Sequence, residues 1–376
     1  MPPPFLRGVG RSPIRRISDR AKPGDISFGL GEPDLPTPDV IREEAIRVIK
    51  EEQNGYTLQA GLPALRERVA AYYPDMKLST DQVVITAGSQ EALYLALMSL
   101  VSEGDEVLLP DPGFVAYPTI VQMAGGIPVY YHLPAARNFA FDVDEFRAKV
   151  SSRTKVVLCT SPSNPTGRAL SAADLSAMAD ALRGTDAFVI SDEIYRDLYY
   201  TTERPASISS SYERTIVISG LSKSMSMTGW RLGWICGHEA VVRSALVLHG
   251  YVTTCASTVS QKAALAAFTV EGENARADIR RTFRERRDHL LNLIAGELGV
   301  RAVTPEGAFY TMVDISRYGS SMDVAETLLN HGVITIPGSP FGRESEGFLR
   351  VSFCADKEKI TEGVRRMKQG LSEMLP

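Results

Sequence analysis

The residue of this sequence whose type and surroundings most clearly indicate chemical reactivity is a lysine in a glycine- and serine-rich loop. Lys223 stands between Ser222 and Ser224, after an apolar segment, and Arg231 follows eight positions later. A lysine amine is a nucleophile towards carbonyl carbon and can carry a proton, although a lone lysine is usually a solvated surface residue. A serine-hydrolase site is not predicted here, because the Ser-x-x-Lys pattern would need a serine where Gly220 stands.

Two further polar motifs follow apolar segments nearer the N-terminus. Asn-Pro-Thr-Gly occupies 164–167, just after the segment 156–160, and Ser-Asp-Glu-Ile-Tyr occupies 191–195, after a very apolar segment at 187–190. The carboxylate of Asp192, at the inner end of a buried strand, is costly to bury unless it meets a cation or several donors. Taken alone, the first motif is also typical of a turn before a helix, and the second of a helix cap.

A fourth motif has the form of an anion-binding turn. Ala-Gly-Ser-Gln at 87–90 lies between an expected strand and an expected helix, where free N–H groups and the helix dipole attract phosphate. A tight turn with a serine cap is the alternative. The G-x-G-x-x-G and G-x-x-x-x-G-K motifs are absent, and the segment 29–34 lacks the third glycine, so no evident nucleotide-binding fold is predicted.

Seven short apolar segments must position these motifs. They are apolar on both faces, as is typical of strands covered by helices on both sides. The expected strands are 83–87, 106–109, 127–131, 156–160, 187–191, 215–219 and 232–236. Helical segments lie between most of them, such as 90–101 and 171–182, the latter with Ser171 as its cap. The alternation predicts an α/β fold whose large domain has three layers and a mostly parallel seven-stranded sheet. The short connection before the last strand makes one strand there antiparallel.

The character of the sequence changes after residue 255. A nearly continuous helix is predicted for 256–298, and the expected elements after it are strands at 307–313 and 348–353 and helices at 322–331 and 357–374, the last capped by Asp356. We expect them to form a smaller α+β domain together with the N-terminal arm, which has no clear element before Pro38 opens a helix. The predicted division is 1–40 for the arm, 41–270 for the large domain and 271–376 for the small domain.

Composition and spacing disfavour several classes of function. The 41 Lys+Arg against 45 Asp+Glu leave a net charge of -4, which argues against nucleic-acid binding. The four cysteines form no C-x-x-C pair and the five histidines no H-E-x-x-H or H-x-x-x-H pair, so no metal site is expected. Neither a signal peptide nor an apolar stretch long enough to span a membrane is found, so a cytoplasmic protein without a membrane partner is predicted.

Taken in their order along the chain, the motifs resemble those of the fold type I pyridoxal 5'-phosphate (PLP) enzymes, specifically the class I/II aminotransferases. The resemblance extends over almost the whole chain. The matching positions are 31–34, Tyr56 with 61–66, Gly88, 164–167, 192–195, 222–223, 227–233 and 350–353. Because independent motifs recur in the same order, the resemblance is highly specific.

The resemblance implies roles around the cofactor ring. Lys223 is similar to the lysine that forms the internal Schiff base and then moves the substrate proton. Asp192 matches the carboxylate that keeps the pyridine nitrogen protonated, so that the ring can act as an electron sink. Tyr195 and Asn164 match the donors to the ring 3-oxygen. Phe114 stands where the family stacks an aromatic ring on the cofactor, and an ordinary core phenylalanine is its alternative.

The resemblance also implies how phosphate and substrate are held. The residues that match phosphate ligands are Gly88, Ser89, Gln90, Ser222 and Arg231. Tyr56 matches a phosphate ligand of the neighbouring subunit, which implies a homodimer; a packed aromatic on a turn is the alternative. Arg350 resembles the arginine that grips the substrate α-carboxylate bidentately, with an edge-strand arginine as the alternative. Gly31 and Asn164 match positions that face the substrate.

The implied function is a PLP-dependent aminotransferase (EC 2.6.1 class) that moves an amino group from an L-amino acid to a 2-oxo acid by a ping-pong Schiff-base mechanism. One alternative is a PLP-dependent β-C–S lyase on the same fold. Another is a non-enzymatic PLP-sensing regulatory domain, disfavoured because no winged-helix segment precedes residue 30. No arginine stands between Arg243 and Arg276, where some dicarboxylate-specific relatives place a second one, which disfavours aspartate unless Arg15, Arg16 or another loop supplies the charge.

Overall fold

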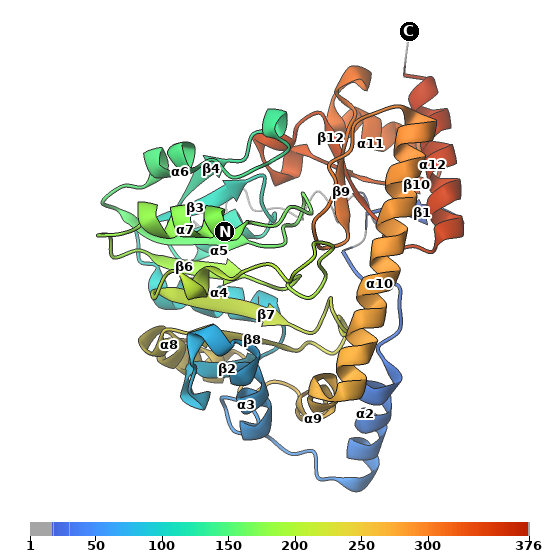
Figure 1. Ribbon diagram of the computed structural model, residues 1–376. Helices are drawn as coiled ribbons and strands as arrows, with labels where there is room; N and C mark the ends of the chain where they lie inside the picture. The colour runs from blue at the N-terminus through green and yellow to red at the C-terminus, as the bar shows by residue number, and fades with distance from the viewer. Residues whose placement is uncertain (1–16, 18, 30, 375–376) are drawn as a thin grey trace, which may run out of the picture.

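A seven-stranded sheet forms the centre of the larger part of the molecule in the computed structural model, which describes residues 17, 19–29 and 31–374 (Figure 1). In spatial order the strands are β2 (Val83–Thr86), β8 (Gly233–Gly237), β7 (Thr215–Gly220), β6 (Phe188–Asp192), β5 (Thr154–Thr160), β3 (Glu106–Asp111) and β4 (Ile127–His132). All seven expected strands are confirmed to within two residues at either end. Strand β8 is antiparallel to both of its neighbours while the other pairs are parallel, as the short connection before it predicted.

Helices cover both faces of this sheet. They are α2 (Asp39–Glu51), α3 (Pro63–Tyr72), α4 (Ser89–Leu100), α5 (Tyr117–Met123), α6 (Val143–Lys149), α7 (Ala172–Ala181), α8 (Glu239–Val252) and α9 (Thr258–Ala264). Side chains alternate along a strand, so Val156 and Leu158 of β5 pack with α4, α5 and α8, whereas Val157 and Cys159 pack with α6 and α7. On that second face α2, α3 and α9 cover the β2 end of the sheet. The three-layer α/β prediction is confirmed.

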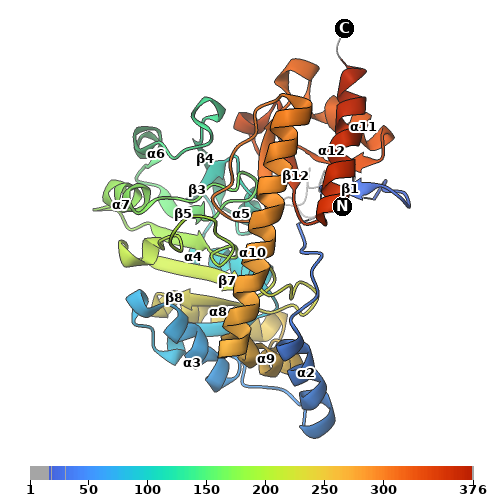
Figure 2. The same cartoon turned by 45° about the vertical axis from the view of Figure 1, so that its right-hand side comes forward.

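The C-terminal part has a smaller antiparallel sheet, as predicted. Its strands in order are β11 (Ile336–Pro337), β12 (Phe348–Ser352) and β9 (Tyr310–Asp314), and its helices are α10 (Val270–Leu293), α11 (Ser321–Asn330) and α12 (Lys357–Ser372). Figures 1 and 2 show that α10 runs from the level of α9 to the level of α12 and so accompanies both parts of the molecule. Asp356 caps α12 through the Lys359 N–H at 2.7 Å, which confirms the expected cap.

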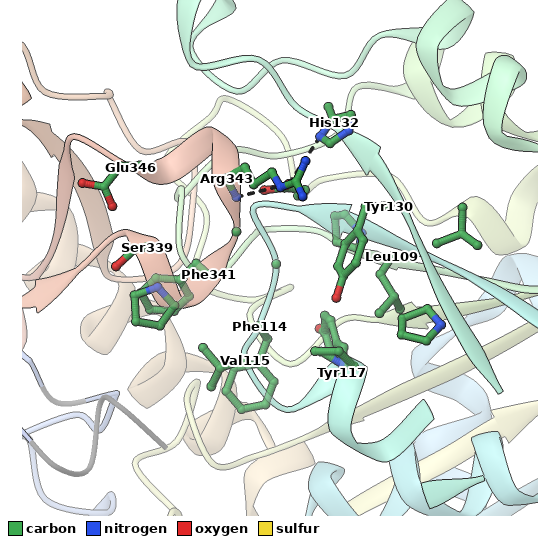
Figure 3. A pocket seen from close by; sticks show the side chains of 18 of the residues that line it. Leu109, Phe114, Val115, Tyr117, Tyr130, His132, Ser339, Phe341, Arg343 and Glu346 are labelled. Carbon is green, nitrogen blue, oxygen red and sulfur yellow. Dashed lines mark hydrogen bonds and ion pairs between the residues drawn. The ribbon is translucent and has the colours of Figure 1, made fainter. Parts of the chain in front are cut away.

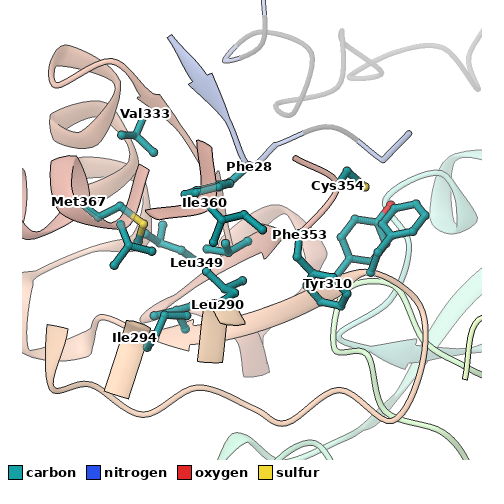
Figure 4. Packing of buried hydrophobic residues seen from close by; sticks show 14 of the residues in the cluster. Phe28, Leu290, Ile294, Tyr310, Val333, Leu349, Phe353, Cys354, Ile360 and Met367 are labelled. Atoms are coloured by element: carbon teal, nitrogen blue, oxygen red, sulfur yellow. The ribbon is translucent and has the colours of Figure 1, made fainter. Parts of the chain in front are cut away.

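The described N-terminal segment packs with this C-terminal part. Strand β1 (Ile26–Ser27) pairs in parallel with β10 (Val333–Ile334). Phe28 is fully buried in the same hydrophobic core as Phe353 and Ile360, and Figure 4 shows these three side chains together. The packing of the arm thus follows from its apolar residues, whereas the exact domain limits at 40 and 270 stay a prediction.

The expected continuous helix at 256–298 is wrong in one respect. The chain leaves α9 through the 3-10 turn Leu265–Phe268 and then extends at Thr269, whose ψ is 172°. The Thr269 hydroxyl accepts a hydrogen bond from the Gly272 N–H at 3.2 Å, so threonine begins a new helix instead of continuing the old one. Helix α10 ends in a π-helical turn at Ile294–Leu298, before Gly299 in the left-handed conformation.

Short 3-10 helices lie in several connections. Those outside the segments already described are Pro74–Met76, Thr80–Gln82, Ala135–Arg137, Ile208–Ser210, Ser316–Tyr318, Ser339–Phe341 and Arg343–Ser345. The four cysteines are free thiols. Within the described ranges, no helix has the length and hydropathy needed to cross a membrane, and no three metal-ligating side chains gather. The cytoplasmic location stays a prediction.

Candidate active site

A cavity of about 430 Å³ lies where the carboxyl ends of β5 and β6 meet the start of α4 and the strand β12. Ligands of open α/β sheets bind at this edge. The predicted site residues that line it are Gly31, Ser89, Gln90, Phe114, Asn164, Asp192, Tyr195, Ser222, Lys223, Arg231 and Arg350. The structure therefore gathers residues from segments more than 300 positions apart in the sequence into one cavity.

The amine of Lys223 is held inside this cavity by a backbone carbonyl. Its Nζ donates a hydrogen bond to the carbonyl oxygen of Gly31 at 2.6 Å. Burial lowers the pKa of Lys223, because removal of water disfavours the charged ammonium. A lysine with a lowered pKa has a larger neutral fraction and is a better nucleophile and base near neutral pH.

Asp192 is a buried carboxylate at the end of β6 and forms no ion pair within the described ranges. Its Oδ2 accepts a hydrogen bond from the Tyr117 hydroxyl at 2.9 Å, and its Oδ1 accepts one from the Ile194 N–H at 3.2 Å. Burial raises the pKa of Asp192 to about 6. A carboxylate in this state would be stabilised by a cation brought in with a ligand.

Arg350 of β12 carries the opposite charge on the other wall of the cavity. Its Nη1 donates to Asn164 Oδ1 at 3.0 Å and its Nη2 to the Gly29 carbonyl oxygen at 2.6 Å. The residue is 3% exposed, and burial lowers the pKa of its guanidinium. Its partners in the described part of the chain are neutral, its Nε has none there, and its Cζ lies 4.4 Å from the centre of the Tyr310 ring. The guanidinium is thus prepared to receive an anion.

The start of α4 and Arg231 form a second anion-binding region. Gly88 precedes the helix with a φ of 92°, and a Cβ on it would lie 2.5 Å from Arg231 Nη2. Arg231 donates to the carbonyl oxygens of Thr228 at 2.9 Å and Ala87 at 3.2 Å, which orient its fork towards the helix. Free N–H groups at a helix start, next to an arginine, suit a phosphate group.

Comparison with known proteins agrees with this geometry. The model of the family described as Aminotransferase class I and II matches residues 23–367. The chain belongs to the class I and II aminotransferases. This aminotransferase is 36% identical to an aspartate aminotransferase of Pyrococcus horikoshii over 96% of its own length and 95% of that protein. It is also 36% identical to aromatic-amino-acid aminotransferase 2 of Thermococcus litoralis, over 98% and 97%.

Solved structures of aminotransferases share the fold. The aspartate aminotransferase of Thermus thermophilus with maleate superposes with a TM-score of 0.94 at 30% identity, and the match covers 98% of this chain and 99% of that one. The enzyme is therefore a transaminase of fold type I, and its family uses PLP. The matches give no support to the alternatives of a C–S lyase or a PLP-sensing regulatory domain.

Two of the predicted site residues do not line the cavity of this aminotransferase. Gly88 lies beside it, against Arg231. Tyr56 is 87% exposed on the surface of the single chain, so its reach into a neighbouring site stays a prediction. Arg15 and Arg16, named above as alternative sources of charge, lie outside the described residues.

Sequence reasoning missed several residues of the aminotransferase site, among them Tyr117, Thr160 and Tyr310. Tyr117 donates to Asp192, Thr160 shares a hydrogen bond of 2.5 Å with Tyr117, and Tyr310 shares one of 3.0 Å with Tyr195. Thr160 could have been found, because it is the last residue of β5 and the register partner of Asp192. Arg350 pairs with Met312 of β9, and Tyr310 lies two residues from Met312 on the same strand. Such a diagonal contact between two strands cannot be recognised from the pattern of either strand alone.

Proposed function

We propose that the cavity binds PLP and that the enzyme uses it to move an amino group from an L-amino acid to a 2-oxo acid in two successive half-reactions. The observation that carries this proposal is a pair of buried, oppositely charged side chains, Asp192 and Arg350, neither of which has a charged partner among the described residues. A ligand set that brings a protonated ring nitrogen to one and a carboxylate to the other compensates both charges. When bound, PLP supplies an aldehyde that condenses with amines and a ring that withdraws electrons from the substrate Cα.

The residues of the chain fit the three polar parts of this cofactor. Asp192 would hold the ring nitrogen in its protonated form, and Tyr117 would keep the carboxylate oriented. Arg231, with the N–H groups at the start of α4, would hold the phosphate. The remaining proposed contacts of the phosphate come from Gly88, Ser89, Gln90 and Ser222. Tyr195 and Asn164 would donate to the ring oxygen, and Phe114 would cover the ring face.

Lys223 would bind the aldehyde in the resting enzyme and move the proton at the substrate Cα during turnover. Its lowered pKa favours this use, because a base must release its proton before it can accept another. The Gly31 carbonyl oxygen, 2.6 Å from Nζ, keeps the amine pointed into the cavity.

Arg350 would bind the substrate α-carboxylate. Its planar fork matches two carboxylate oxygens, and Asn164 and the Gly29 carbonyl oxygen hold the fork in place. Because Arg350 is nearly inaccessible to water, the interaction is poorly screened and discriminates strongly in favour of a carboxylate.

We further propose a homodimer in which Tyr56 contributes to the phosphate site of the partner. Five large apolar side chains stand exposed on neighbouring segments of the chain: Tyr56, Leu58, Val247, Tyr251 and Val252. Gln59 Nε2 donates to the Leu246 carbonyl oxygen at 2.8 Å and so ties the Tyr56 segment to α8, which carries the last three. An exposed apolar patch of this kind is typical of a protein interface.

The experiment that tests the proposal is borohydride reduction of the purified holoenzyme followed by peptide mapping. We expect the cofactor on the peptide that contains Lys223, and attachment to another lysine would refute the site. Turnover with a panel of amino donors against 2-oxoglutarate and pyruvate then tests the reaction. Formation of pyruvate and ammonia without any acceptor would indicate elimination instead of transamination.

A further inference from the structure

Asp111 joins the large sheet to a loop of the C-terminal part. It is the last residue of β3 and only 3% exposed. Its Oδ2 accepts a hydrogen bond from the Arg343 N–H at 3.2 Å, and its Oδ1 accepts one from the Glu344 N–H at 3.3 Å. A carboxylate of one part of the molecule therefore caps the 3-10 turn Arg343–Ser345 of the other part.

The residues around this junction are adapted to the close approach. Gly342 has a φ of 140°, and a Cβ on it would lie 1.9 Å from Asp111 Oδ1, so only glycine fits. The Gly113 N–H donates to the Phe341 carbonyl oxygen at 2.9 Å, which adds a third bond between the two segments. His132, the register partner of Asp111 on β4, has its Nδ1 3.3 Å from Asp111 Oδ2.

The loop held in this way carries an aromatic ring to the substrate-binding arginine. The ring of Phe341 lies with its centre 5.0 Å from Arg350 Cζ, and the ring of Tyr310 at 4.4 Å from the same atom. Contact with aromatic faces restrains a guanidinium through cation–π attraction. The position of Phe341 therefore contributes to the orientation of Arg350.

One side of this loop faces an open pocket. A pocket of about 720 Å³ separates Pro340 and Phe341 from Tyr130 of β4, with Phe114 also in its lining. Figure 3 shows this pocket, with His132 and Arg343 next to each other in its lining. Among the described residues, the hydrogen bonds that join the loop to the large domain on that side involve Asp111, Gly113 and the Ala135 N–H, which donates to Glu344 Oε2 at 3.3 Å.

We propose that Asp111 is a positioning residue for substrate binding, which holds the loop 339–345 so that Phe341 keeps Arg350 in its carboxylate-binding orientation. This inference rests on the proposed role of Arg350. Asp111 does not line the cavity of the site, so it would act through residues that do, and the loop links it to Phe341 and Arg350.

The test compares Asp111→Asn and Asp111→Ala with wild-type holoenzyme in KM, kcat, cofactor dissociation constant and thermal midpoint. A displaced Arg350 should raise KM for every amino donor on the order of 10- to 100-fold in Asp111→Ala, as expected for a misplaced binding group. Asp111→Asn keeps one acceptor oxygen and should show a smaller rise, with cofactor affinity within about two-fold of wild type in both. An unchanged KM in a folded Asp111→Asn variant would overturn the proposal.

Asp142→Ala is the matched control. Asp142 also accepts two backbone N–H groups, those of Asp144 at 3.1 Å and Glu145 at 3.3 Å, but both belong to its own helix α6. This variant should lower the thermal midpoint and leave KM within about two-fold. A similar rise of KM in Asp142→Ala would mean that general destabilisation explains the effect of Asp111, which would overturn the proposal.

A double variant tests the route through Phe341. If Asp111 acts through this ring, Asp111→Asn should raise KM much less in a Phe341→Ala background than in the wild type. Equal fold-changes in the two backgrounds would refute the route.

The variant Arg350→Lys separates this inference from the proposed function. A raised KM in Arg350→Lys together with an unchanged KM in the Asp111 variants refutes only the positioning role. An unchanged KM in Arg350→Lys refutes the substrate role of Arg350 and the inference with it.

Discussion

Replacement of Arg350 by lysine tests the substrate side of the site most directly. Lysine keeps the positive charge but loses the planar fork, so one of two charged hydrogen bonds to a carboxylate disappears. A hydrogen bond to a charged group contributes about 1.5–3 kcal/mol, which corresponds to a rise in KM of about 10- to 150-fold. The upper half of this range is expected here, because Arg350 is only 3% exposed and solvent would replace the lost bond poorly.

The assay is steady-state turnover with several amino donors, together with titration of the cofactor. We expect KM to rise for every donor, because the α-carboxylate is common to all of them, while cofactor affinity stays within about two-fold. Arg301→Lys is a matched control, since Arg301 pairs with Asp314 on the exposed side of the C-terminal part, at 3.3 Å from Nε and 3.2 Å from Nη2. Loss of cofactor, or a raised KM for only one class of side chain, would contradict the reasoning.

Three further predictions concern the cofactor side. Lys223→Ala should still bind PLP but lose turnover by several orders of magnitude, measured as product formed per enzyme, because no group remains to move the substrate proton; a loss below ten-fold would exclude that role. Burial raises the pKa of Asp192 to about 6, so the cofactor-free protein binds this proton more tightly when folded and loses stability as the pH rises from about 4 to 6. The free energy of unfolding of the cofactor-free protein, measured with denaturant, should show this decrease with pH in the wild type and not in Asp192→Asn. The same pH dependence in both proteins would contradict the prediction. Gly88→Ala should weaken PLP binding at least ten-fold in an absorbance titration, because its Cβ would meet Arg231 at 2.5 Å; unchanged affinity would argue against the phosphate region.

Local sequence patterns were sufficient to predict most strands and helices of this protein. The strand β5 was predictable because all but one of its residues are buried and its centre, 156–159, is a continuous apolar run. The helix α7 was predictable from its start, where Ser171 and Asp174 form a capping box. Thr269 shows the limit of such patterns: a threonine inside a helical pattern is compatible with continuation, and only the turn of the chain before α10 makes it a cap.

The motifs of the site were recognised as a set because each keeps its own short spacing, yet their contacts were not predictable from that spacing. Asn164 and Arg350 are 186 positions apart and share a hydrogen bond only because β12 of the small sheet lies over the carboxyl end of β5. Tyr117, the first residue of α5, reaches both Asp192 and its register partner Thr160 because α5 starts above these neighbouring strands.

The sequence by itself determined which segments become strands and helices, which turn precedes α4, and which charged side chains follow the strands. These properties depend on residues a few positions apart, so hydrophobic period and turn chemistry encode them. Only the tertiary structure decided that Asp192 and Arg350 are buried without a charged partner among the described residues and that Asp111 reaches the loop 339–345. Strand order, register and the seating of the C-terminal part bring those atoms together, and they arise from packing of the whole chain rather than from any one segment.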